Sequence, residues 1–119
     1  MATRDLFLFL ALVLFLIVPN VSAGAPKEVT VAAVDGMVID MDRSVLQRLK
    51  VRVKSLGPGF CSVRVRFGGA MVNLMAPPLA WSEWMSVGDA IAGGAHRLNV
   101  SPQCSVGAIA EVRYFRTSP

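Results

Sequence analysis

The residues best placed to act on another molecule are five cations in two short alternating segments. In residues 50–54 and 62–67, apolar side chains alternate with polar or charged ones, a period typical of strands with one buried face. Turn-forming Gly57-Pro58-Gly59 lies between them, so we expect an antiparallel hairpin. Its exposed face would carry Lys50, Arg52, Lys54, Arg64 and Arg66, with Arg48 and Arg113 nearby.

The chemistry of such a basic face is electrostatic binding. Like charges opposite each other on a sheet are destabilising, so carboxylates, solvent or an anionic partner must offset them. We expect docking on an anionic surface, an acidic glycan or an acidic protein. The alternative is a solvated face neutralised by neighbouring carboxylates, for which the candidates are Asp40, Asp42, Glu83 and Glu111. Nucleic acid is not expected, because the chain carries the export signal described below and because no aromatic residue interleaves with the cations on their exposed side.

Two tryptophans form a second candidate binding element. Trp81 and Trp84 follow Pro77-Pro78 in a stretch with the composition of a loop. Paired indole rings can stack on sugar rings or anchor a protein interface, and they can equally close the open end of a core. The two rings would share a face of a helical turn and lie on opposite faces of a strand.

Catalysis and metal binding have little support in the sequence. His96 is the single histidine, and Asp89 is the carboxylate nearest to it in sequence. Asp40-x-Asp42 lacks the further acids and the glycine of a calcium loop, and methionines are more often core residues than copper ligands. We therefore predict a protein that is not an enzyme and needs neither a metal nor another cofactor.

The N-terminal residues 1–23 read as a cleaved secretory signal peptide. Arg4 precedes an apolar run over residues 6–18, and the small residues Val21-Ser22-Ala23 follow. As a helix this run is about 20 Å long, whereas a bilayer core needs about 30 Å, which argues against the alternative of a permanent anchor. We expect cleavage after Ala23, no membrane span afterwards, and a secreted or periplasmic protein.

Two cysteines, Cys61 and Cys104, are present in this exported chain. An oxidising compartment favours their pairing, and two cysteines allow one intramolecular disulfide. The alternative is a pair of buried free thiols.

The rest of the chain, residues 24–119, is expected to form a single all-β domain. Short apolar or alternating segments are separated by Gly and Pro turns, and the formal net charge of the chain is +4. We expect a further hairpin at Asp35-Gly36, between residues 28–34 and 37–41. The spacing resembles that of immunoglobulin-like and jelly-roll modules, which predicts a small antiparallel β-sandwich of about seven strands with one disulfide.

These features together predict a non-catalytic binding module that uses its basic face, with the tryptophan loop as a second anchor. One alternative is a structural subunit of a larger extracytoplasmic complex or of a homo-oligomer. Another is a small inhibitor of a secreted enzyme, in which the loop at 57–59 or at 77–78 acts as a plug.

Overall fold

The computed structural model describes residues 26–117, which form eight strands and no helix. The predicted signal peptide, residues 1–23, lies outside the described residues. Between residues 26 and 117 there is accordingly no helix long and apolar enough to cross a membrane. The strands are β1 (Pro26–Ala33), β2 (Val38–Met41), β3 (Gln47–Ser55), β4 (Cys61–Phe67), β5 (Ala70–Ala76), β6 (Met85–Ile91), β7 (Gly94–Pro102) and β8 (Ala108–Thr117).

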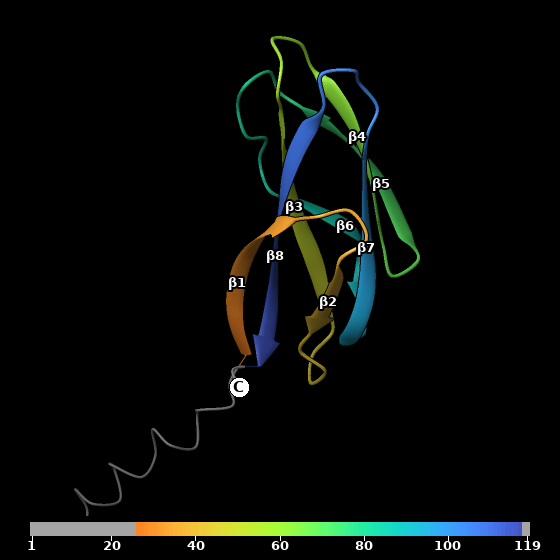
Figure 1. Ribbon diagram of the computed structural model, residues 1–119. Helices are drawn as coiled ribbons and strands as arrows, with labels where there is room; N and C mark the ends of the chain where they lie inside the picture. Colours follow the sequence, from red (N-terminus) through yellow and green to blue (C-terminus); the bar gives the residue numbers. More distant parts are fainter. Residues whose placement is uncertain (1–25, 118–119) are drawn as a thin grey trace, which may run out of the picture.

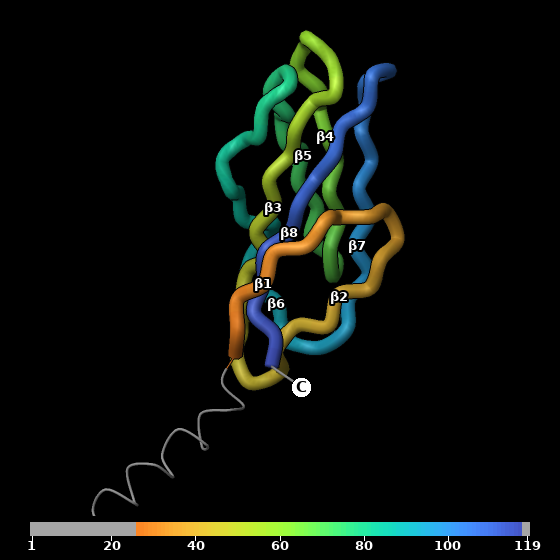
Figure 2. Tube along the Cα trace, turned by 60° about the vertical axis from the view of Figure 1, so that its left-hand side comes forward, coloured from red at the N-terminus to blue at the C-terminus, as the bar shows by residue number. Residues whose placement is uncertain are grey.

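The strands form two four-stranded sheets, β1-β8-β3-β6 and β2-β7-β4-β5, which face each other as a sandwich (Figure 1). All neighbouring strands are antiparallel. Strand β1 pairs with β8, β2 with β7, β3 with β6 and β4 with β5, so that the first four strands and the last four run alongside each other in reverse order (Figure 2). This is the jelly-roll arrangement. The predicted all-β sandwich is confirmed, with eight strands.

The predicted basic hairpin is wrong. Strand β3, which contains residues 50–54, and β4, which contains residues 62–66, belong to different sheets. The chain over residues 56–60 crosses from one sheet to the other instead of reversing within one sheet. The alternation correctly indicates that each strand buries one face, and in a sandwich these two faces meet in the core from opposite sides.

The hairpin expected at Asp35-Gly36 is absent for the same reason. Strands β1 and β2 also lie in different sheets, although Gly36 has the positive φ of a turn residue. A tight hairpin occurs instead between β4 and β5, where Gly68 and Gly69 both have positive φ, as a type I′ turn requires. Phe67 and Ala70 face each other across this turn.

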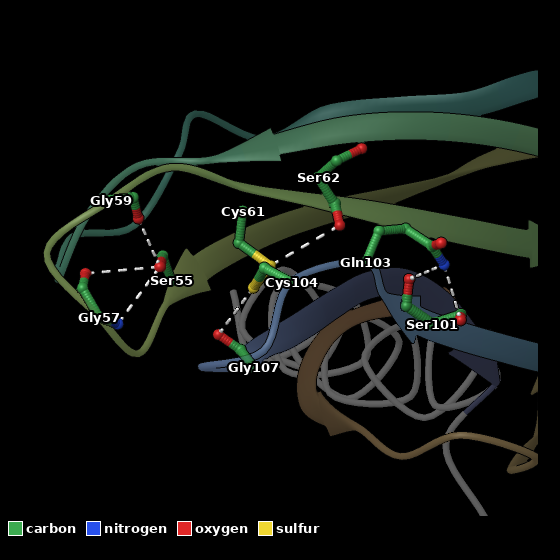
Figure 3. Close-up of a disulfide and its surroundings, with 9 residues drawn as sticks. All are labelled: Ser55, Gly57, Gly59, Cys61, Ser62, Ser101, Gln103, Cys104 and Gly107. Carbon is green, nitrogen blue, oxygen red and sulfur yellow. Dashed lines mark hydrogen bonds between the residues drawn. A yellow bond between two sulfur atoms is a disulfide. The ribbon is translucent and has the colours of Figure 1, made fainter.

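The core lies between the sheets and is made by alternate residues of each strand. Leu49, Val51 and Val53 of β3 meet Val63 and Val65 of β4, and all five are 0% exposed. The predicted disulfide joins Cys61, the first residue of β4, to Cys104 in the loop before β8 (Figure 3). It ties the central part of one sheet to a loop that leads into the other. Such a bond is typical of proteins that fold in an oxidising compartment.

Candidate functional site

Strand β3 carries a row of cations on the outer face of its sheet. Residues at odd positions of the strand are buried, so the even positions point away from the core. These outward residues are Arg48, Lys50, Arg52 and Lys54. Three of the five residues predicted for the basic face, Lys50, Arg52 and Lys54, therefore do lie in one row.

The neighbouring strand β8 both adds to this charge and offsets it. Its register with β3 places Arg113 opposite Lys50 and Glu111 opposite Arg52. A like-charge pair directly opposite each other destabilises a sheet, whereas an opposite-charge pair stabilises it. The Arg52–Glu111 pair is therefore neutralised, whereas the neighbouring Lys50–Arg113 pair places two positive charges opposite each other.

Both tryptophans lie on this same outer face. The segment that follows β5 crosses to the other sheet, where Trp81 forms an isolated antiparallel bridge with Lys54. Trp84 immediately precedes β6, which pairs with β3 on the side away from β8. Trp81 and Trp84 are each partly buried. The tryptophans therefore cover the outside of a sheet and do not close the end of the core.

The two rings and two guanidinium groups form a stack, which we call the Trp–Arg ladder. Its members are Trp81, Arg52, Trp84 and Arg113. The Cζ atom of Arg52 lies 4.7 Å from the ring centre of Trp81 and 4.8 Å from that of Trp84. The Cζ atom of Arg113 lies 4.2 Å from the ring centre of Trp84. All three distances are within the range of cation–π attraction.

The ladder contradicts the expectation that no aromatic residue lies among the exposed cations. Aromatic side chains do lie among the exposed cations, because residues 77–84 bring Trp81 and Trp84 to β3 from a distant part of the chain. The prediction that nucleic acid is not a partner now depends on the predicted compartment alone. No feature of residues 50–54 themselves could have revealed this contact.

Two carboxylates hold the guanidinium groups of the ladder. Glu111 forms a salt bridge with Arg52, whose Nε donates a hydrogen bond to Glu111 Oε1 at 2.7 Å. Glu28 of β1 lies 3.7 Å from Arg113 Nε, which also donates a 3.4 Å hydrogen bond to the Thr30 hydroxyl. Glu111 was among the expected neutralising residues, whereas Glu28 was missed. Its role follows from β1 pairing with β8, which the local sequence does not reveal.

The lysines of the row are not neutralised in this way. Among residues 26–117, the ion pairs within 4.0 Å are those of Arg52 and Arg113. Lys50 has no carboxylate partner in this range, and the nearest aromatic neighbour of Lys54 is Trp81, with Nζ 5.8 Å from the ring centre. Arg48, which is exposed on the same row, has no carboxylate partner in this range either. The uncompensated positive charge of this face is thus carried by Lys50, Lys54 and Arg48, beside the Trp–Arg ladder.

Arg64 and Arg66 do not belong to this face. They lie on β4 and point outward from the other sheet, where both are exposed. Their cross-strand neighbours are uncharged: Asn73 and Ser101 beside Arg64, and Met71 and Asn99 beside Arg66. The single basic face of five cations is therefore wrong in geometry, and its two halves lie on opposite sides of the sandwich.

The loops considered for an inhibitory plug lie together at the disulfide end of the sandwich. The Ser55 hydroxyl accepts a hydrogen bond from Gly57 N–H and donates one to the Gly59 carbonyl, which fixes residues 56–60 (Figure 3). Ser55 also bonds the second loop, with its N–H donating to the Pro77 carbonyl. Phe60 at the tip is 67% exposed. The inhibitor role stays a prediction.

A buried carboxylate lies near the opposite end, at the edge of a cavity of about 670 Å³. Asp42 is 3% exposed and accepts hydrogen bonds from the Ser44 hydroxyl, the Thr117 hydroxyl and, at 2.8 Å, the Ser44 N–H. These bonds, that of the Ser44 hydroxyl foremost, hold the pKa of Asp42 below its usual value. The local sequence signal for this arrangement is an Asx turn, in which the Ser44 N–H donates to the side chain of Asp42 two residues earlier. The carboxylate links the end of β8 to the β2–β3 loop.

His96 contacts a backbone carbonyl group and a core aromatic ring. Its Nε2 is 2.8 Å from the Ala92 carbonyl oxygen, and its ring packs edge-on against Phe67, with centroids 5.5 Å apart. Within residues 26–117 no group of three or more His, Cys, Asp or Glu residues is arranged to hold a metal ion.

Comparison with known proteins supplies no functional assignment: no family model matches the chain, and no curated protein matches its sequence. Function must therefore be argued from the site itself.

Proposed function

We propose that this protein is a non-catalytic binding module, secreted or periplasmic, which holds an acidic glycan along the outer face of β3. The observation that carries the proposal is the Trp–Arg ladder beside the unpaired Lys50 and Lys54. An acidic glycan offers repeated carboxylate or sulfate groups, which suit a linear row of cations.

The spacing of the row supports a polymeric anion. Outward residues two apart on a strand are separated by about 6.6 Å, so Lys50, Arg52 and Lys54 extend over about 13 Å. The lysine ammonium groups are compact charges on flexible stems, which can adapt to anions that are not placed at one fixed distance. The central Arg52 is held by two rings and by Glu111 and so sets the direction of the row.

The cost of this arrangement also favours a ligand. Lys50 faces Arg113 directly across the strands, a placement that destabilises the free sheet. The ladder and Glu28 stabilise Arg113 in place without removing the charge of Lys50. A bound anion would relieve this repulsion. The fold also holds these cations in place before the ligand arrives, which lowers the free-energy cost of binding.

The experiment is retention of the purified protein on an immobilised sulfated polysaccharide, eluted with increasing salt. The test variant is Lys50→Gln/Lys54→Gln. The matched control is Arg64→Gln/Arg66→Gln, which removes the same charge from the opposite face. We expect the test variant to elute at much lower salt, whereas the control elutes close to the wild-type protein.

Equal shifts for the two variants would show that net charge and not this face governs retention. Failure of the wild-type protein to be retained at low salt, where the Debye length is about 30 Å at 10 mM, would reject an anionic ligand altogether.

A further inference from the structure

Strand β5 is an edge strand without the usual protection. It lies at the end of the order β2-β7-β4-β5, and no described strand pairs with its free side (Figure 1). Its seven residues, Ala70–Ala76, include no charge and no proline. Such an edge offers unpaired backbone groups to another chain.

The other three edge strands carry features that discourage pairing. Strand β1 contains Pro26, Lys27 and Glu28, and β2 is only four residues long and contains Asp40. Strand β6 contains Asp89 and a register irregularity in its pairing with β3. Prolines, charges, short length and bulges are the means by which sheets protect their edges. Among the four edge strands of the described sandwich, β5 is the one that lacks these protective features.

The hairpin fixes which backbone groups of β5 are free. In a two-residue turn the flanking residues, here Phe67 and Ala70, exchange their backbone hydrogen bonds, and the bonded pairs recur at every second residue. The even-numbered residues of β5 therefore bond to β4. The N–H and C=O groups of Met71, Asn73 and Met75 point to the free edge.

The sequence of β5 is complementary to itself. The residues at equal distances on the two sides of Asn73 are alike: Val72 and Leu74, Met71 and Met75, Ala70 and Ala76. An antiparallel pair with a two-fold axis at Asn73 thus places residues of like size and polarity opposite each other. A contact between identical patches of two subunits requires this kind of self-complementarity.

From these observations we propose that two copies of the chain pair through β5, antiparallel and centred on Asn73. The pair joins the two β2-β7-β4-β5 sheets into one continuous sheet. About six backbone hydrogen bonds form between the two β5 strands, because Met71, Asn73 and Met75 all have both groups at the edge.

Side chains and charge fit the same register. Met71 is 52% exposed and Met75 is 55% exposed. In the proposed dimer, Met71 of each subunit packs against Met75 of the other subunit. Arg64 of β4 lies directly opposite Asn73 of β5. In the line of residues that crosses the strands through Asn73, it is the cation nearest to the two-fold axis. The two copies of Arg64 are three strand spacings apart, about 14 Å, which exceeds the Debye length of about 8 Å at physiological salt. The repulsion between them is therefore largely screened.

The pairing also has a consequence for the outer face of β3. The two-fold axis is perpendicular to the joined sheet, so both copies of that face point to the same side. A dimer could therefore engage one polymer through both faces at once. Formation of the dimer does not depend on the proposed ligand.

The test is sedimentation equilibrium of the purified protein from about 10 μM to 1 mM, because so small an interface is expected to be weak. We expect the average mass of the wild-type protein to rise from one chain to two and no further. Asn73→Lys places two ammonium groups together at the axis and should hold the protein at one chain throughout. Ser101→Lys is the matched control: it adds the same charge on the other side of Arg64, inside the sheet, and should dimerise like the wild type.

Several results would overturn the inference: a wild-type protein that stays at one chain at 1 mM, a mass that rises beyond two chains, or equal weakening by both lysines. Circular dichroism of each variant shows whether it is folded. Cysteine cross-linking tests the register independently of any weakening. Asn73→Cys should form a disulfide-linked dimer, since paired residues have Cα atoms about 5.5 Å apart, whereas Met75→Cys faces Met71 and should not. Equal cross-linking of the two would contradict the register.

Discussion

Replacing Trp84 by leucine should destabilise the fold by an amount that the Trp–Arg ladder determines. The ring of Trp84 lies 4.8 Å from the Cζ atom of Arg52 and 4.2 Å from that of Arg113. Each exposed cation–π contact contributes about 0.5–1 kcal/mol, so the loss of two lowers the free energy of unfolding by about 1–2 kcal/mol. For a domain of this size that corresponds to a fall of about 5–15 °C in Tm.

A double-mutant cycle separates the ladder from other effects of the substitution. Chemical denaturation gives the free energy of unfolding of the wild type, of Trp84→Leu, of Arg113→Gln and of the double variant. The single change at Arg113 also removes its long contact with Glu28, an exposed pair that contributes about 0–1 kcal/mol. This contribution cancels in the cycle. We expect a coupling energy of about 0.5–1 kcal/mol, and a value within about 0.3 kcal/mol of zero would refute the ladder as a stabilising unit.

Three further predictions concern the scaffold that holds this face. Replacing both cysteines by serine opens a loop spanning 43 positions and should lower the free energy of unfolding by about 4 kcal/mol in urea denaturation, and an unchanged midpoint would contradict this. The lowered pKa of Asp42 means that its carboxylate stabilises the fold above about pH 4, and that this contribution is lost as the pH falls further. Thermal denaturation from pH 7 to 2 should therefore show a steeper loss of Tm for the wild type than for Asp42→Asn, and parallel curves would reject it. Gly88→Ala should destabilise by about 1–3 kcal/mol, because Gly88 has φ +63° and the new Cβ would lie 2.5 Å from that of Ala70. Gly59→Ala, where nothing lies within 4 Å, is its control and should change the free energy of unfolding by less than about 0.5 kcal/mol.

Local alternation in the sequence correctly predicted which residues of β3 and β4 are buried. Val51, Val53, Val63, Val65 and Phe67 were all assigned to the inner face, and each is 0% exposed. The period of two reports the direction of a side chain relative to its own strand. It contains no information on which other strand lies alongside, so the pairing of β3 with β8 and β6 was missed.

The candidate site was only half predictable for a related reason. Lys50, Arg52 and Lys54 lie on one strand, so their shared face follows from spacing alone. The contact of Trp81 with Arg52 depends on a crossing between sheets, and no local pattern encodes it. Arg64 was grouped with these residues by proximity in the sequence, and the change of sheet after β3 separated them.

The most direct test of the central claim is a ¹H–¹⁵N NMR titration of the protein with a sulfated oligosaccharide. The two indole N–H signals of Trp81 and Trp84 are separate reporters within the ladder, and the backbone amides report on every strand. The account predicts that both indole signals and the amides of β3 move together and saturably as ligand is added. Shifts confined to the strand with Arg64 and Arg66, or to the loops at the disulfide end, would contradict it.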